Sequence, residues 1–443
     1  MDASIGKTPF WKSYPVENQN FLIIFAYEGY AMERKRILQV LLLGLLLLLP
    51  LAAAAQGDTL HLGHLVRGRV TDGRNGQPLE AVHVYLPGRH HATVTNADGR
   101  FTLKSDAPIT TVIFSHLGYK TRRVKPGNGP MEVELAQEAL ALDGAAIISG
   151  NARHIVEEAI SRIRDNYPSQ PELLSCFYRE TVRKRSRYTY VSEAVARLYK
   201  NAYTSAPWQD RSALDKSRIL ISQRRRDTLS VKMQGGPTQA LLLDAVKNRD
   251  LLFDADMLPL YSFEMDFPQR LEGRLHYVIR LHPAAEYEYA LYDGTLYIDS
   301  ETLCFSRIEL SMDMADPVKA TRLILVRKPL SLRFRPREVS LVLTYRRHED
   351  GLARLSYLRS VIRFDCDWRR RLFSTPYTVV NELVVTDKVE PAVPIAREDM
   401  FRQQDILNDK AAEFLDPAFW EDYNIIEPSE SLEHAIDRLK KRR

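Results

Sequence analysis

Val66 to Leu103 read VRGRVTDGRNGQPLEAVHVYLPGRHHATVTNADGRFTL, where short runs of β-branched and aromatic residues alternate with clusters of turn-forming residues. With the residues up to Leu135, the pattern predicts five strands, which are Val66–Thr71, Ala81–Leu86, Arg100–Lys104, Thr110–His116 and Met131–Leu135. The turns recur about every eight to twelve residues, the spacing typical of a small β-sandwich. The stretch therefore predicts a small all-β module.

The turn clusters contain the residue types that tight reversals need. They are Asp72-Gly73, Asn75-Gly76, Asn96-Ala97-Asp98-Gly99 and Pro126-Gly127-Asn128-Gly129. Gly and Asn adopt positive φ at low cost, and Asx side chains hydrogen-bond their own backbone. In the second run, Val82, Val84 and Leu86 alternate with polar or aromatic neighbours, which indicates a strand with one buried face.

Three phrases of this region occur in an order that resembles a known module. GRVTD…GQPLEAVHVYL is followed by TNADGRFTL and then by FSHLGYK. This order is similar to the carboxypeptidase regulatory-like domain, a transthyretin-like β-sandwich found beside zinc carboxypeptidases and at the N-terminus of many bacterial envelope proteins. The resemblance implies an accessory domain without catalytic residues of its own. The chain as a whole resembles exported bacterial proteins that carry such a domain at the N-terminus.

The residues before this module have the organisation of a secretory signal peptide. A basic segment, Met32–Arg36, precedes the apolar run Ile37–Leu49, and small residues follow up to Ala55. We expect cleavage after Ala55, with residues 1–31 an over-extended start and 32–55 the signal peptide. The alternative is an uncleaved membrane anchor over Ile37–Ala55. Cleavage predicts an exported protein, periplasmic or associated with the outer membrane, with no mature transmembrane helix.

Charge and cysteine content exclude several classes of protein. The net charge is +5, from 62 basic and 57 acidic side chains, and so small an excess does not predict a nucleic-acid partner. Three cysteines, Cys176, Cys304 and Cys366, cannot form a disulfide framework and match no zinc motif. We expect buried free thiols, with a single bridge as the alternative.

We expect the sandwich over residues 65–136, a linker over 137–150, a larger domain over 151–428 and a C-terminal helix over 429–443. The larger domain should begin with an amphipathic helix at Ile155–Ile163, and Pro237–Phe253 predicts a second helix. Strands are expected at Leu275–Leu281, Gly294–Ile298, Leu303–Met312, Glu338–Tyr345, Leu355–Phe364 and Tyr377–Val385. Their short connections favour an antiparallel meander.

Part of this meander is similar to a periplasmic lipoprotein carrier. Asp293–Asp299 (DGTLYID), followed by the strand Ser306–Leu310, resembles a hairpin of these half-barrels, in which a curved antiparallel sheet wraps a few helices. The predicted fold class is therefore mainly β: a transthyretin-like sandwich followed by a larger, curved antiparallel sheet with a few helices.

The sequence favours a non-catalytic envelope protein that binds a protein partner or a glycan. No metal or cofactor is expected, because HxxE at His154–Glu157 recurs by chance on amphipathic helices and no hydrolase motif has supporting context. A carrier of a lipid or other apolar ligand is the first alternative, and a secreted hydrolase is the second. Five aromatic residues are candidates for an exposed binding platform: Trp208, Tyr287, Tyr289, Tyr292 and Tyr297. The alternative for most of them is core or cross-strand packing. The carrier would use the apolar strand residues Leu296, Ile298, Leu303, Phe305, Ile308 and Leu310.

Overall fold

The computed structural model describes residues 64–138, 151–224, 232–233, 235–327, 329, 331–368, 374–402, 405, 407, 412–413, 420 and 423–440. The expected signal peptide and residues 139–150 of the expected linker lie outside these ranges. In the described part of the chain, no helix combines the length and apolar character that crossing a membrane requires.

The N-terminal region folds into two small sheets that face each other. One has the order β4 (Arg100–Ser105), β1 (His64–Asp72), β7 (Met131–Leu135), and the other the order β3 (Ala92–Val94), β2 (His83–Tyr85), β5 (Val112–Ser115), β6 (Arg122–Val124). Their inner faces form one apolar core, in which the rings of Phe101 and Phe114 meet edge to face at 5.3 Å. The five predicted strands are confirmed. The pattern missed the three-residue strands β3 and β6, which lack the alternating apolar flanks that Val82 and Leu86 provide for β2.

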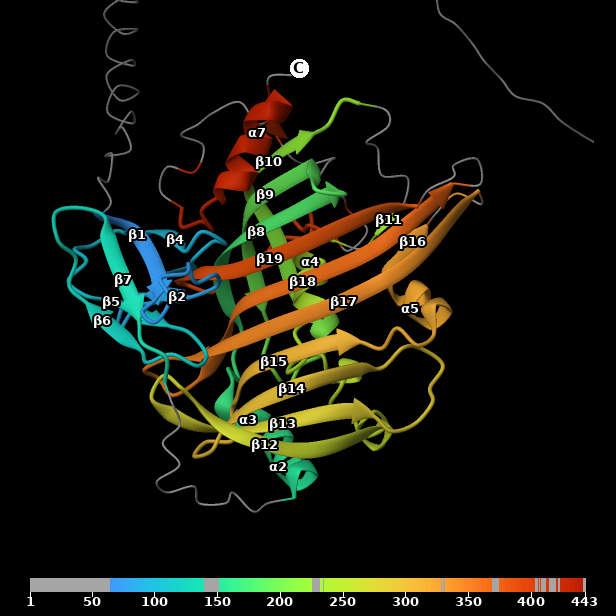
Figure 1. Cartoon of the computed structure of the whole chain (residues 1–443). Helices are drawn as coiled ribbons and strands as arrows, with labels where there is room; N and C mark the ends of the chain where they lie inside the picture. The colour runs from blue at the N-terminus through green and yellow to red at the C-terminus, as the bar shows by residue number, and fades with distance from the viewer. Residues whose placement is uncertain are drawn as a thin grey trace, which may run out of the picture. The chain divides into compact units, whose positions relative to one another are not determined.

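Most of the strands described after residue 151 form one sheet of eleven strands (Figure 1). Its order is β12 (Tyr261–Leu271), β13 (Arg274–Pro283), β14 (Tyr292–Asp299), β15 (Phe305–Met312), β17 (Leu332–Arg347), β18 (Ala353–Trp368), β19 (Thr375–Val389), β8 (Glu172–Lys184), β9 (Arg187–Lys200), β10 (Arg211–Ile221) and β20 (Ala412–Glu413). All neighbours are antiparallel except β10 and β20. The predicted antiparallel meander is confirmed, and β11 (Lys232–Met233) pairs separately with β16 (Leu325–Arg327).

The pairing of β19 with β8 joins the two halves of this sheet. The register runs from Tyr377 opposite Lys184 to Val389 opposite Leu173, so the last strand of the meander lies beside the first strand of the region. Without this pair, β8 to β10 and β12 to β19 would be two separate sheets, each with an additional unpaired edge.

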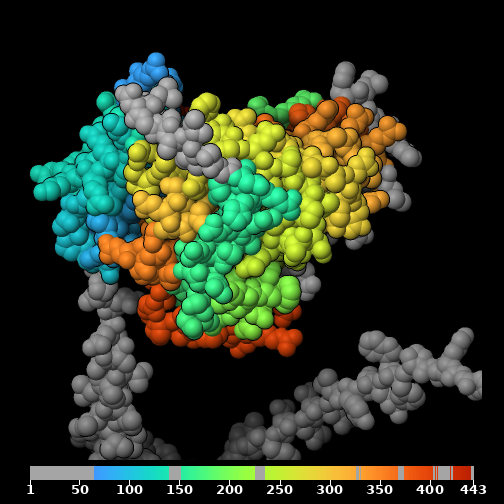
Figure 2. Space-filling view, turned by 90° about the horizontal axis from the view of Figure 1, so that it is seen from below, coloured from blue at the N-terminus to red at the C-terminus, as the bar shows by residue number. Residues whose placement is uncertain are grey.

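One face of the sheet is covered by helices. These are α2 (Ala152–Ser161), α3 (Ile163–Asn166), α4 (Pro237–Leu242) and the 3-10 turns η1 (Pro207–Gln209), η3 (Arg249–Leu251) and η4 (Leu258–Leu260). Figure 2 views the molecule from below, where the α2–α3 segment lies across the surface, and α2 contacts β12. Buried side chains of α2, α4 and the strands form the largest apolar cluster of the molecule. The predicted helix at Ile155–Ile163 is confirmed, although it divides into α2 and α3.

The expected helix over Pro237–Phe253 is wrong beyond Leu242. After α4, backbone bonds from Asp244 to Leu241 and from Lys247 to Asp244 form tight turns. The physical reason is tertiary, because the buried side chains of Asp244 and Lys247 are held by ion pairs to Lys200 and Asp210. The hydrophobic periodicity of the segment contains no information about these long-range ion pairs.

Two helices lie at the rim of the sheet. α5 (Pro317–Ile324) was not anticipated from the sequence, and its N-cap is Asp316, which accepts from the backbone of Val318 and Lys319. α7 (Glu430–Lys440) confirms the expected closing helix and packs Leu432 and Ile436 against β9 and β10.

All three cysteines are free and buried, which confirms the first of the two readings offered by the sequence. Burial raises the pKa of each thiol above its ordinary value. None of them is therefore a reactive thiolate near neutral pH.

Gly99 and Gly127 provide a matched test of the turn chemistry in the sandwich. Gly99 has φ +74°, and a Cβ there would lie 2.3 Å from the carbonyl oxygen of Val70, whereas a Cβ at Gly127 meets nothing within 4 Å. We expect Gly99→Ala to lower the free energy of unfolding by about 2–4 kcal/mol, because strain and overlap add. Gly127→Ala should change it by less than about 0.5 kcal/mol. Urea denaturation followed by circular dichroism measures both, and equal effects would contradict the assignment.

Candidate functional site

The apolar strand residues that the sequence offered as a carrier cavity are packed in the core. Leu296, Ile298, Phe305, Ile308 and Leu310 are each at most 3% exposed, and Leu303 packs against the same cluster. The Phe305 ring stacks on Phe253 at 4.7 Å between ring centroids, and the Tyr167 hydroxyl donates to the carbonyl oxygen of Phe305 at 2.9 Å. At these positions, side chains of the protein occupy the space that an acyl chain would need.

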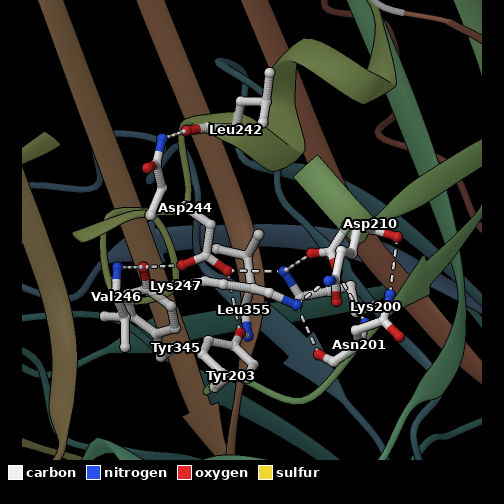
Figure 3. A network of polar contacts seen from close by, with 12 residues as sticks. Lys200, Asn201, Tyr203, Asp210, Leu242, Asp244, Val246, Lys247, Tyr345 and Leu355 are labelled. Carbon is white, nitrogen blue, oxygen red and sulfur yellow. Dashed lines mark hydrogen bonds and ion pairs between the residues drawn. The ribbon is translucent and has the colours of Figure 1, made fainter. Parts of the chain in front are cut away.

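A cluster of buried charges lies on the same side of the sheet (Figure 3). The Lys200 ammonium, at the end of β9, is 2.9 Å from the Asp244 carboxylate, and the Lys247 ammonium is 2.5 Å from that of Asp210. The hydroxyls of Tyr203 and Tyr345 donate to Asp244 at 3.1 and 2.7 Å. Each charge therefore has a partner of opposite sign.

The electrostatics of this cluster stabilise the ionised state of Asp244. Burial raises the pKa of its carboxyl, but the Lys200 ammonium and the tyrosine hydrogen bonds outweigh burial and hold the pKa below its ordinary value. The contribution to stability is therefore present above about pH 4 and is lost as the pH falls through the folded-state value. Side chains that are at most 4% exposed cannot meet a substrate, so the cluster fixes the fold of the loops around it.

The structure separates most of the five aromatic residues expected to form a platform. Tyr287 and Tyr289, between β13 and β14, are brought together, with ring centroids 4.6 Å apart. Trp208 lies on η1 and is 74% exposed, whereas Tyr292 begins β14 and is half-buried. Tyr297 is only 7% exposed, so the expectation that it is exposed is wrong. Its neighbours on β13 and β15 cover it, which strand alternation cannot reveal. A binding role for these aromatics stays a prediction.

The sandwich is attached to the other face of the sheet through residues 423–430, which we call the C-terminal strap. Asn424 exchanges two hydrogen bonds with the backbone of Lys104, at 2.7 and 2.9 Å. Thr93 donates to the carbonyl oxygen of Ile425 at 2.8 Å, while Arg179 of β8 donates to that of Ile426 at 2.6 Å. The strap is thus bonded to both parts, and an apolar cluster that includes Val94, Phe177 and Trp420 lies around it.

A cleft of about 560 Å³ opens where the sandwich meets the sheet. The sandwich contributes Tyr85–His90, Thr121 and Arg123, and the sheet contributes the β12–β13 turn and the β17–β18 turn, Arg346–Gly351. The Tyr85 hydroxyl donates to Glu272 at 3.0 Å, and the rings of His90 and His348 stack at 4.5 Å. Two parts of the chain far apart in sequence therefore build one site.

The cleft is positively charged and contains no basic imidazole. Its lining has five arginines and three carboxylates. Burial, then the charges of Arg354 and Arg346, lowers the pKa of His90 to about 4, and burial together with Arg346 lowers that of His348 to about 2. Both rings are neutral at pH 7, and such weak bases are poor general-base catalysts at that pH.

Glu272 lies in the two-residue turn between β12 and β13, with φ +55°, and Gly273 follows with φ +76°. Positive φ at both positions is what a type I′ hairpin turn requires. This turn presents its carboxylate to Tyr85 across the junction.

The sequence contains signals for both turns of the cleft but none that they meet. His90-His91 and His348-Glu349-Asp350-Gly351 each have the polar residues typical of a turn. Their apposition depends on how the sandwich docks on the sheet, and no local pattern contains that information. In the described residues, no group of three or more His, Cys, Asp and Glu side chains is arranged to hold a metal ion.

Lys200 and Arg197 of β9 allow a matched test of the buried cluster. Lys200→Met keeps the aliphatic stem but leaves Asp244 without its cation, so we expect a loss of about 3–5 kcal/mol in the free energy of unfolding. Arg197, whose side chain is 40% exposed, pairs with Asp215 at 2.7 Å, and Arg197→Met should cost less than about 1 kcal/mol. Chemical denaturation at pH 7 compares them, and a small effect of Lys200→Met would mean that the cluster is dispensable.

Comparison with known proteins gives one family and several distant structures. No curated protein matches the sequence. A putative outer membrane lipoprotein-sorting protein domain from Vibrio parahaemolyticus is 10% identical, covering 56% of this chain and 95% of that one, with a TM-score of 0.24. A DUF1329 family protein from Desulfovibrio piger is 11% identical over 53% and 94%, with a TM-score of 0.22. A LolA superfamily protein from Nitrosomonas europaea is 12% identical over 57% and 99%, with a TM-score of 0.20.

Structures this dissimilar give no information about the ligand or activity of this protein. The family match is more specific: residues 66–146 match the model of the CarboxypepD_reg-like domain. This match confirms that the N-terminal sandwich resembles a carboxypeptidase regulatory-like domain, as its sequence motifs indicated.

Proposed function

We propose that this protein is a non-catalytic binding protein of the cell envelope, and that its ligand is polar and occupies the cleft between the sandwich and the sheet. The observation that carries the proposal is the cleft itself, because both parts of the chain contribute charged side chains to it. In this account the sandwich expected over residues 65–136 completes a site on the domain expected over 151–428.

The way the two parts are joined supports a binding role. The C-terminal strap bonds to both, and further contacts across the junction include Tyr85 with Glu272 and Arg359 with Glu80 at 3.5 Å. When the walls of a site are already ordered, ligand binding does not have to order them. Less of the binding free energy is then spent on conformational entropy.

The two alternatives have weaker support. A lipid carrier needs an apolar cavity, but the strand residues that would line it are buried against Phe253 and Tyr167. A hydrolase acting in the cleft would lack a histidine base at pH 7, because the pKa values of His90 and His348 are low. The location in the envelope rests on the signal-peptide pattern of residues 32–55.

Arg123 and Arg122 on β6 offer a test of the proposed site. Both are exposed and they point to opposite sides of the strand, and only Arg123 lines the cleft. We expect native mass spectrometry of protein purified from the envelope fraction to detect a polar ligand or a protein partner. Arg123→Glu should lower its occupancy at least about tenfold, a loss of about 1.4 kcal/mol, because the charge in the cleft is reversed.

Arg122→Glu serves as the control and should retain the bound species. Two results would contradict the proposal: equal occupancy in both variants, or a lipid at near one-to-one ratio in the organic extract of the wild-type protein.

A further inference from the structure

Arg346 is a buried cation whose partner is missing from the described part of the chain. It lies near the end of β17, is 7% exposed, and its guanidinium lies 4.4 Å from the centroid of the Tyr85 ring. Among the residues that the structure describes, it forms no hydrogen bond or ion pair, and the buried Nη1 atom is without a partner. Burial lowers the pKa of Arg346, although Tyr85 and the Glu272 carboxylate act in the opposite direction. A buried guanidinium without a hydrogen-bonded partner is unfavourable.

Two other arginines that line the cleft have carboxylate partners: Arg274 pairs with Asp299 at 3.1 Å and Arg89 with Asp106 at 3.3 Å. The remaining two, Arg123 and Arg347, are exposed and half-buried, so water can reach them. Arg346 therefore differs from its neighbours in the same environment. Tyr85 contributes only the face of its ring, since its hydroxyl is engaged with Glu272.

A second unpartnered group lies in the wall of the same cleft. The hydroxyl of Thr121, at the edge of the sandwich, is buried and has no hydrogen-bond partner in the described residues. A hydroxyl donor from one part of the chain and a guanidinium from the other thus both line the cleft without protein acceptors. Arginine is the side chain best suited to bind planar or tetrahedral oxyanions through two parallel hydrogen bonds.

We propose that Arg346 and Thr121 form an oxyanion subsite in the cleft, which holds a carboxylate, phosphate or sulfate group of the ligand. This inference rests on the proposed function and adds the chemical class of the ligand. The oxyanion would supply the hydrogen-bond acceptors that Arg346 and the Thr121 hydroxyl lack among the described residues. The volume of the cleft, about 560 Å³, accommodates a small acidic molecule or a single acidic sugar residue.

A bound water is the competing explanation for the unpartnered Nη1 atom. Arg346 also lines a small pocket of about 20 Å³, which is shared with His83, and the Nε2 atom of His83 is likewise buried without a partner. One water fits that volume and has polar neighbours there. A water would satisfy Arg346 without making the protein respond to anions, so the two explanations predict different results.

The test is thermal unfolding of the purified full chain in sodium phosphate, sodium sulfate or sodium glucuronate, each matched in ionic strength with sodium chloride. We expect at least one oxyanion to raise the Tm by about 2 °C or more, saturably, relative to chloride. Arg346→Met should abolish this rise. Without oxyanion, Arg346→Met should be at least as stable as wild type, because a buried guanidinium that forms no ion pair or hydrogen bond is replaced by an apolar chain of similar length.

Two further variants keep the test decisive. Thr121→Val preserves shape and should weaken the response at least threefold in apparent Kd, even if Arg346→Met fails to fold. Arg337→Met is the matched control: Arg337 lies on the same strand, is 61% exposed and pairs with Asp365 at 2.7 Å, so its removal should leave the response unchanged.

The proposal is overturned if no oxyanion raises the Tm above the chloride control, or if Arg346→Met responds as wild type does. A polar but uncharged ligand found by native mass spectrometry, together with no response to oxyanions, would leave the binding function standing and remove only the subsite.

Discussion

The structure depends on the pairing of β19 with β8, because this pair turns two groups of strands into one sheet with two large faces. Both faces carry apolar side chains at this seam. Cys176 and Tyr178 face the helices, whereas Phe177, between them on β8, faces the sandwich side. A sheet that is apolar on both faces must be covered on both. The helices meet that need on one side, and the sandwich with the C-terminal strap meets it on the other.

The position of the sandwich follows from this constraint, and the cleft follows from the position of the sandwich. Because the strap bonds to β8 and to the sandwich, the β17–β18 turn lies against the segment around His90. The side of the sheet covered by helices is closed by its own residues, whereas the polar junction with the sandwich is open to a ligand. A regulatory-like sandwich, which is accessory in the family it resembles, here supplies half of the wall of a site.

Strands and turns could be predicted from local sequence patterns. Features that depend on contacts between distant parts of the chain could not. Alternation identified the strands β13 to β19 except for the three-residue β16. The predicted turn residues around Gly76 and Gly99 allow the reversals that the structure contains. The prediction of a helix over Pro237–Phe253 was wrong because Asp244 and Lys247 bind side chains more than thirty residues away in the chain. Arg346 could not be distinguished from other strand arginines, since its lack of a partner appears only once the sandwich is docked. The exposure of Tyr297 was likewise decided by neighbouring strands.

The central claim is that the ligand is held between the sandwich and the sheet, and hydrogen–deuterium exchange tests it most directly. The protein would be compared as purified with its bound species and after that species has been removed. The account predicts added protection in both Tyr85–His90 and Arg346–Gly351, which form opposite walls of the cleft. Protection of only one wall, or of the core strands β14 and β15 instead, would contradict it.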